Sequence, residues 1–254
     1  MRIDLYLVSA GHASSRERAQ ALISDGKVLV NEKICQKNST DVSDADTVTL
    51  TGDLKYVGRG ALKLECALDT FSVDVTGKTV LDVGASTGGF TDCCLQRGAA
   101  FSVAVDVGHG QLAPSLASDP RVKNLEGVHI KDLHSVWQGT AGLICADVSF
   151  LSLSHVLPYL VPFCDETTDV IVLVKPQFEV RHRKSVIRDP AVHRQVLRSV
   201  ISFACNSGFS PQGLIPSPLR GTEGNVEFLL YLKYHQAPCP VDIDGAVKRA
   251  HERK

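Results

Sequence analysis

The most apolar run in the chain, residues 170–174, ends at Lys175. It contains only valine, isoleucine and leucine, a composition typical of a strand buried on both faces of a parallel sheet. In such sheets, ligands bind outside the carboxyl ends of the strands. The pattern therefore predicts that Lys175 points into an active-site crevice. The simpler alternative is a lysine that extends from a strand end into solvent.

Shorter apolar runs predict further strands of the same sheet. They lie at residues 79–83, 103–106, 143–147, 213–215 and 226–232. Helices are predicted between them, one through Cys93 and Arg97 and one that opens at Asp189-Pro190 and continues to Ile201. This alternation predicts an α/β fold with a doubly wound, Rossmann-like sheet.

Residues 1–52 show a different pattern and are predicted to form a small α+β domain. Two short helical patterns are separated by a break at Gly11. The second helix is predicted to open with a capping box at residues 14–17 and to end at Gly26. A hairpin is predicted at residues 27–34, because two β-branched runs flank a turn there.

The domain boundaries follow from where apolar periodicity stops and restarts. Residues 53–57 are predicted to be a linker, and a main domain is predicted at residues 58–237. The remaining residues, 238–254, are rich in proline and then in charge, which predicts a frayed tail.

Composition restricts the function classes. The net charge is −1, so a surface for nucleic acid must be local. No apolar stretch approaches the roughly 20 residues that a membrane span requires, and no secretory leader is apparent. The eight cysteines and nine histidines show no zinc-ligand spacing, which predicts no metal and free thiols in a reducing cytoplasm.

A glycine-rich turn follows the predicted strand at 79–83. Its glycines, Gly84, Gly88 and Gly89, match neither the dinucleotide pattern GxGxxG nor the Walker pattern GxxxxGK[ST]. With Asp82 near the strand end, the segment instead resembles the first motif of S-adenosylmethionine-dependent methyltransferases.

The same resemblance implies a set of cofactor-binding residues. Asp106 ends the next strand, where a carboxylate can accept both ribose hydroxyls of an adenosine. Asp132 lies where the superfamily places a residue near the adenine, although a helix-capping aspartate is an equal alternative. The complete set is Asp82, Gly84, Ala85, Ser86, Thr87, Gly88, Gly89, Phe90, Asp106, Val107, Asp132 and Asp147.

The first domain has a small excess of basic residues. Six basic side chains stand against four acidic ones in its first forty residues, and charge alone favours an ordinary solvated domain. Residues 2–4, 14–19 and 22–31, however, resemble the small RNA-binding fold of the fourth small-subunit ribosomal protein. That likeness implies recognition of structured RNA through shape and phosphates. The expected RNA-binding residues are Arg2, Arg16, Arg18, Lys27, Lys33, Lys37 and, beyond the linker, Arg59.

Four segments of the main domain resemble the Lys-Asp-Lys-Glu tetrad of FtsJ-type ribose 2′-O-methyltransferases. They are residues 58–64, 147–150, 175–179 and 224–227, which make Lys63, Asp147, Lys175 and Glu227 the expected catalytic residues. Together with the first domain, the chain is similar from residue 1 to about residue 233 to the TlyA family of rRNA methyltransferases, often labelled hemolysins.

The family resemblance implies an S-adenosylmethionine-dependent enzyme that methylates ribosomal RNA on a ribose 2′-hydroxyl. The implied target is cytidine in large-subunit rRNA and also in small-subunit rRNA. The partner would be ribosomal RNA or a ribosomal subunit, and the enzyme would be a cytoplasmic monomer.

The chemistry leaves two roles open for Lys175. A ribose hydroxyl must be aligned with the methyl group and lose its proton as attack proceeds. A lysine with an ordinary pKa of about 10.4 is protonated at neutral pH, so a general base would need burial or a neighbouring cation, which Lys63 could supply. Otherwise Lys175 aligns the hydroxyl, and Asp147 and Glu227 orient the lysines.

Two features depart from the family pattern, and three rival functions compete with the methyltransferase interpretation. Residues 181–186 are basic and poor in glycine, typical of either a phosphate-facing or a merely solvated loop, and Arg220 stands where the family often has a small residue or proline.

The rival functions are a base N-methyltransferase, a membrane-damaging cytolysin and an inactive RNA-binding regulator. Val148 and Ser149 replace the prolines that are typical of the first rival.

Overall fold

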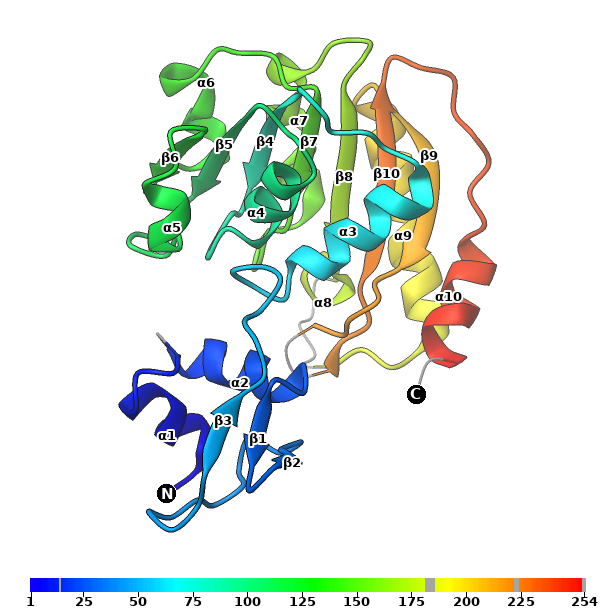
Figure 1. Ribbon diagram of the computed structural model, residues 1–254. Coiled ribbons are helices and arrows are strands. Elements are labelled where there is room, and N and C mark those ends of the chain that lie inside the picture. Colours follow the sequence, from blue (N-terminus) through cyan, green and yellow to red (C-terminus); the bar gives the residue numbers. More distant parts are fainter. Residues whose placement is uncertain (14, 181–185, 222–223, 253–254) are drawn as a thin grey trace. The chain divides into compact units, whose positions relative to one another are not determined.

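The computed structural model describes residues 1–13, 15–180, 186–221 and 224–252. The chain forms two compact units, Met1–Arg59 and Gly60–Lys254 (Figure 1). Of the basic loop at residues 181–186, predicted to be either phosphate-facing or solvated, residues 181–185 lie outside the described residues.

The first unit packs two helices against a three-stranded antiparallel sheet. Its elements are α1 (Ile3–Ser9), α2 (Arg16–Ser24), β1 (Val28–Val30), β2 (Lys33–Ile34) and β3 (Val48–Leu50), with sheet order β2-β1-β3. The hairpin turns at Asn31 and Glu32, both with positive φ, which confirms the predicted turn. Ile3, Leu7 and Leu22 lie fully buried in its core.

The start of α2 differs by one residue from the predicted capping box. Ser15 is the N-cap, and its hydroxyl accepts a hydrogen bond from the Arg18 amide at 3.2 Å. The third helical position is therefore Arg18 rather than Glu17, so the reciprocal half of a capping box cannot form. Two adjacent serines precede the helix, and the sequence pattern alone does not distinguish them.

The second unit is built on a seven-stranded sheet with the order β6-β5-β4-β7-β8-β10-β9. Five strands are parallel: β4 (Thr79–Val83), β5 (Phe101–Asp106), β6 (Val122–Glu126), β7 (Leu143–Ala146) and β8 (Asp169–Val174). Strand β10 (Phe228–Tyr234) runs antiparallel between β8 and β9 (Phe209–Pro216). The alternating pattern missed β6, an edge strand without an apolar run.

Helices cover both faces of this sheet, which confirms the doubly wound α/β class (Figure 1). Helices α3 (Ala61–Phe71) and α4 (Gly89–Gln96) lie on one face, and α7 (Leu157–Leu160), α9 (Pro190–Asn206) and α10 (Ile243–Glu252) on the other. Shorter elements are α5 (Pro114–Ala117), α6 (Leu133–Val136), α8 (Pro176–Glu179), η1 (Ile130–Asp132), η2 (Leu153–His155) and η3 (Val161–Phe163).

The predicted tail at residues 238–254 is wrong for most of its length. Helix α10 buries Ala246, Val247 and Ala250 in the core that α9 also joins. Small apolar side chains on one stripe of a charged helix are enough to dock it against a neighbour. These few apolar residues are outnumbered by charged and polar ones, so the composition of the segment did not indicate a buried helix.

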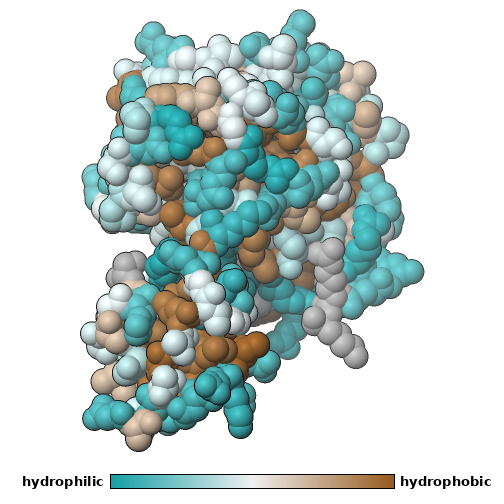
Figure 2. Space-filling model, in the orientation of Figure 1, coloured by the Kyte–Doolittle hydropathy of each residue, from teal (hydrophilic) through white to brown (hydrophobic). Residues whose placement is uncertain are grey.

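The surface is mostly hydrophilic on the side of the second unit seen in Figure 2, whereas the first unit shows more hydrophobic surface there. The exposed large apolar side chains of the first unit are Met1, Leu5, Val8 and Ile34. Among the described residues, no helix is long and apolar enough to cross a membrane.

Candidate active site

The four residues of the expected tetrad lie at one edge of the seven-stranded sheet. Asp147 follows β7 and Lys175 follows β8, and these parallel strands are neighbours. Glu227 precedes β10, which runs antiparallel to β8 with Phe228 opposite Val174. The start of β10 therefore lies at the carboxyl end of β8. The first turn of α3 adds Lys63, whose ammonium group pairs with Glu227.

The pair formed by Lys63 and Glu227 is almost completely enclosed. Its Nζ to Oε2 distance is 2.6 Å, and the side chains are only 12% and 3% exposed. A Cβ on Gly221 would come within 2.1 Å of Glu227 Oε1, so a larger residue there would displace this carboxylate. The Ser217 amide also donates to the Glu227 carbonyl at 2.9 Å. Gly221 thus lies against the carboxylate of Glu227, and Ser217 holds the backbone that carries it.

The pair formed by Lys175 and Asp147 is tied to more partners. Lys175 Nζ lies 2.5 Å from Asp147 Oδ1 and donates to Ser149 Oγ at 2.9 Å. The same ammonium lies 5.9 Å from the centre of the Phe178 ring. An ammonium group has three N–H donors; Ser149 accepts from one of them, and Asp147 balances the charge as its ion-pair partner. N–H donors therefore remain for an incoming oxygen.

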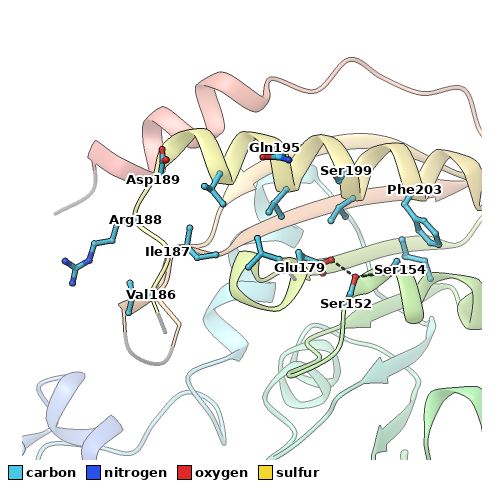
Figure 3. Close-up of a pocket in the computed structure, with 15 residues that line it drawn as sticks. Ser152, Ser154, Glu179, Val186, Ile187, Arg188, Asp189, Gln195, Ser199 and Phe203 are labelled. Atoms are coloured by element: carbon cyan, nitrogen blue, oxygen red, sulfur yellow. Dashed lines mark hydrogen bonds between the residues drawn. The ribbon is translucent and has the colours of Figure 1, made fainter. Parts of the chain in front are cut away.

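The segments after β7 and β8 are held together beyond this ion pair. Phe150 and Phe178 lie with ring centroids 5.0 Å apart. Glu179 accepts from Ser152 Oγ at 2.6 Å and from the Leu153 amide at 2.9 Å, as Figure 3 shows for the serine. Burial raises the pKa of Glu179, and these hydrogen bonds oppose the shift.

The pocket drawn in Figure 3 lies beside the hydrogen bond between Glu179 and Ser152 and has a volume of about 1040 Å³. It runs from Ile187, just before α9, along that helix to Phe203, with Glu179 and Ser152 on its other side. None of the expected catalytic or cofactor-binding residues lines it. Its size alone does not make it the active site.

The glycine turn after β4 approaches the tetrad closely. Gly84 has φ +82°, and a Cβ there would come within 2.5 Å of the Asp147 carbonyl oxygen. Gly88 has φ +90°, and a Cβ there would come within 2.4 Å of a Leu116 methyl group. Both positions therefore require glycine for conformation and for space. The turn brings backbone directly beside Asp147.

A second pocket, of about 370 Å³, lies between the glycine turn and Asp147. Five of the expected cofactor-binding residues line it: Gly84, Ser86, Asp106, Val107 and Asp147. Five others belong to the turn or the start of α4 without lining the pocket: Ala85, Thr87, Gly88, Gly89 and Phe90. Apolar walls come from β4 and β5 through Val83 and Val105.

Asp82 has a different position from the one expected. Its side chain is fully buried and does not line the pocket. It accepts hydrogen bonds from the amide and hydroxyl of Thr91 at 2.9 and 2.8 Å, and so fixes the first turn of α4 behind the glycine turn. Burial raises the pKa of Asp82 to about 7, against the effect of the bonds from Thr91.

Asp132 also lies outside the pocket. It ends the short helix η1, is exposed, and does not line the cavity. His129 and Ile130, just before it, line the pocket instead. Neither residue was predicted from the sequence, because both follow β6, and the half-buried residues of β6 give no recognisable strand pattern. Gln111 was missed as well, since it lies in a loop without a motif.

The basic residues of the first unit are organised around a buried carboxylate. Asp4 is fully buried and pairs with Arg2 at 3.0 Å and with Arg16 at 2.9 Å, while both guanidinium side chains remain about half exposed. The hydrogen bond from Arg2, with others from Gln20 and Arg16, holds the pKa of Asp4 far below its usual range. Arg18 pairs with Asp53 at 2.6 Å.

The remaining residues expected to bind RNA differ in exposure. Lys33, Lys37 and Arg59 are exposed, and Lys27 is half-buried. Arg59 lines a pocket of about 640 Å³ in the first unit, beside the end of α2. Among the described residues, no group of three side chains could hold a metal ion.

Comparison with known families matches both units. Residues 56–234 match the model of the FtsJ-like methyltransferases, and residues 1–48 match the S4 domain. The fold is thus that of an FtsJ-like methyltransferase that carries an S4 domain at residues 1–48.

Individual relatives are similar over nearly the whole chain. The 16S/23S rRNA (cytidine-2′-O)-methyltransferase TlyA of Mycobacterium tuberculosis is 42% identical, covering 98% of this chain and 96% of the relative. Hemolysin A of Brachyspira hyodysenteriae is 36% identical over 91% of this chain and 99% of the relative. A solved structure named as a hemolysin from Streptococcus thermophilus is 36% identical, with a TM-score of 0.77 over 99% of this chain and 96% of that one. The chain therefore belongs to the TlyA family of methyltransferases, as its motifs predicted.

Proposed function

We propose that this enzyme transfers a methyl group from S-adenosylmethionine to a ribose 2′-hydroxyl of ribosomal RNA. The observation that carries the proposal is the edge where two lysine–carboxylate pairs lie beside the glycine turn and its pocket. Aligning a hydroxyl with a methyl group requires fixed donors close to the donor site, and the tetrad supplies them.

The residues present fit the methyl donor. Asp106, at the rim of the smaller pocket, offers a carboxylate to a ribose diol, and the apolar walls from Val83 and Val105 suit an adenine ring. Gly84 lets the backbone approach the reacting groups beside Asp147. When bound, S-adenosylmethionine supplies an electrophilic methyl group on a positively charged sulfur.

We infer that Lys175 aligns the ribose hydroxyl. Its Nζ is held by the ion pair with Asp147 and by the hydrogen bond to Ser149, so a remaining N–H can donate to the hydroxyl oxygen and turn a lone pair toward the methyl carbon. As the oxygen–carbon bond forms, the carbon–sulfur bond breaks, the sulfur becomes a neutral thioether and the hydroxyl proton leaves to water. In the alternative role, neutral Lys175 takes this proton itself.

A pH–rate profile of single-turnover methylation separates these two roles. An aligning lysine loses activity as it deprotonates at high pH, whereas a general base gains activity. We expect a rate that falls on the alkaline side in the natural protein. A rate that rises through an ionisation absent from Lys175→Arg would contradict alignment.

The proposed substrate follows from the names of the relatives. The relative from Mycobacterium tuberculosis is named as a cytidine-2′-O-methyltransferase of 16S/23S rRNA. We propose cytidine in ribosomal RNA as the target, in the large subunit and also in the small one. Such a substrate places the enzyme in the cytoplasm, and we expect it to act as a monomer.

The first unit would hold the RNA through its phosphates. Arg2 and Arg16 are fixed by buried Asp4 and still expose about half of each side chain, so they are preorganised to bind phosphate oxygens. Arg18 is instead paired with Asp53. Binding through phosphates predicts an affinity that falls steeply as salt is raised.

Mapping the modified nucleotide tests the proposal. Ribosomal RNA from cells with the natural enzyme should stop primer extension at a 2′-O-methylated cytidine, and RNA from cells with Lys175→Ala should not. Lys78→Ala is a matched control, because Lys78 forms an ion pair with Asp169 at 2.8 Å at the start of β8, away from the tetrad. Equal stops with natural enzyme and Lys175→Ala would refute the assignment.

Hemolysin is the name of two of the similar proteins, so membrane damage is a second candidate function. It is tested by leakage of dye from liposomes treated with purified protein in the absence of RNA. We expect no leakage at concentrations that give full methylation. Leakage that persists in Lys175→Ala would establish a separate activity.

A further inference from the structure

The loop after β5 is fixed by a carboxylate from the neighbouring strand. Glu126, the last residue of β6, accepts backbone hydrogen bonds from Gly110 at 2.7 Å, Gln111 at 2.8 Å and Leu112 at 3.0 Å. These hydrogen bonds lower the pKa of Glu126, and the bond from the Leu112 amide contributes most. Three consecutive amides that converge on one carboxylate give the loop a defined shape.

Gln111 is the residue of this loop whose side chain reaches the smaller pocket. It lines the pocket, and its Oε1 accepts from Ser86 Oγ at 3.2 Å. A Cβ on Gly108 would come within 1.7 Å of Gln111 Nε2, so the amide group lies directly over a bare glycine. The same Cβ position is 3.2 Å from Asp106 Oδ1. Gln111 and Asp106 therefore flank one glycine at the pocket rim.

Further backbone contacts join this rim to the glycine turn. Asp106 accepts from the Ser86 amide at 2.8 Å and from the Gly108 amide at 2.7 Å. The Ala113 amide donates to the Thr87 carbonyl at 3.1 Å. With the hydrogen bond between Ser86 and Gln111, the two loops are thus linked at three points, and the other two are Ser86 to Asp106 and Ala113 to Thr87.

We propose that Gln111 is a further residue that binds the methyl donor and that Glu126 is a positioning residue that presents it. The inference rests on the proposed function. Beside the Asp106 carboxylate, which can accept from a ribose hydroxyl, the Gln111 amide can donate to a hydroxyl oxygen of the same diol. The pair recognises the ribose of a nucleoside. Glu126 acts only through the loop.

Titration calorimetry of the full chain with S-adenosylmethionine, without RNA, tests this inference. Glu126→Ala removes the acceptor for three amides and Gln111→Ala removes the amide group that they present, so each change should weaken binding about fivefold. Glu126→Gln keeps one acceptor oxygen and should lie between Glu126→Ala and the natural protein. The double variant should bind no more weakly than Glu126→Ala, because both changes remove the same contact.

Kinetics provide a readout that general destabilisation does not mimic. In Glu126→Ala the KM for the donor should rise while kcat at saturating donor stays within about twofold, since uniform binding is lost. Asp74→Ala is a matched control: Asp74 holds the Thr76 amide at 2.9 Å just before β4 and should leave donor affinity unchanged when replaced.

Three results would overturn the inference. They are an unchanged affinity in Glu126→Ala or Glu126→Gln, losses that add in the double variant, or an equal loss in Asp74→Ala. If the natural protein itself does not bind S-adenosylmethionine, the proposed function fails as well. Unaltered affinity in the variants, with tight binding by the natural protein, would refute the role of Gln111 and Glu126 alone.

Discussion

The two lysine–carboxylate pairs at the sheet edge have similar geometry and different surroundings. The carboxylate of the first pair, Glu227, is 3% exposed and lies against Gly221. The carboxylate of the second pair, Asp147, is 20% exposed and lines the smaller pocket. Lys175 is also shared with Ser149 and the Phe178 ring. One pair is built into the fold, and the other faces the space where substrates would meet.

This difference separates two tasks that the tetrad motif presents as one. An enclosed pair anchors elements, here the start of α3 through Lys63 and the start of β10 through Glu227. A pair at a pocket wall can exchange a contact with a substrate. We therefore expect stability to depend most on the first pair and catalysis to depend most on the second.

The largest effect is expected from Lys175→Ala. If Lys175 aligns the hydroxyl as we propose, its loss should lower the methylation rate by about 10³-fold, because positioned donors and acid–base groups contribute on that scale. Single-turnover transfer of tritiated methyl to rRNA measures it. Donor affinity by calorimetry should change little, and a rate within tenfold of the natural enzyme would break the division of tasks.

Glu227→Ala should have the largest effect on stability. It leaves the Lys63 ammonium enclosed without its carboxylate, which costs about 3 kcal/mol of unfolding free energy. Asp147→Ala should cost less, because Asp147 is more exposed and Lys175 retains Ser149. Urea unfolding of both variants gives the comparison. A larger loss in Asp147→Ala would reverse the assignment of the two pairs.

Asp82 shows what a carboxylate does near this edge without a lysine. Its folded pKa of about 7 lies above the ordinary value of about 3.9, so its contribution to stability is full below pH 4 and is lost as pH rises toward 7. Asp82→Asn should flatten the pH dependence of the unfolding free energy across that window. An unchanged slope between pH 4 and 7 would show that Asp82 is ionised throughout.

The smallest effect is expected from Ser149→Ala, which removes one hydrogen bond to Lys175. We predict a loss of about fivefold in methylation rate, corresponding to about 1 kcal/mol. The melting temperature should stay unchanged, since Ser149 is exposed. A loss as large as that of Lys175→Ala would mean that the serine itself contacts the reacting groups.

Sequence patterns predicted those strands of this fold that consist of continuous apolar runs. Strand β8 could be predicted because its residues are all buried, and residues 170–174 are accordingly all apolar. Strand β6 was not, because Val122–Glu126 is a half-buried edge strand with lysine, asparagine and glutamate. Because β6 was not predicted, the residues that follow it could not be placed at the sheet edge. His129, which lines the pocket, is one of them.

The members of the tetrad could be named from motifs, but their pairing could not be derived. Lys63 and Glu227 are 164 positions apart, and they meet because β10 inserts antiparallel beside β8. The sequence suggested Lys63 as a cation acting on Lys175, whereas the structure pairs it with Glu227. Asp82 was misplaced for a related reason: alternation along β4 turns its side chain to the face that α4 covers.

The most direct test of the account is the position of the transferred methyl group and its dependence on Lys175. Ribosomal RNA labelled by the purified enzyme is digested to nucleosides, and the label is separated into ribose-methylated and base-methylated products. The account predicts label in 2′-O-methylcytidine with the natural enzyme and with Lys78→Ala, and none above background with Lys175→Ala. Label on a base, or label in 2′-O-methylcytidine that survives Lys175→Ala, would contradict it.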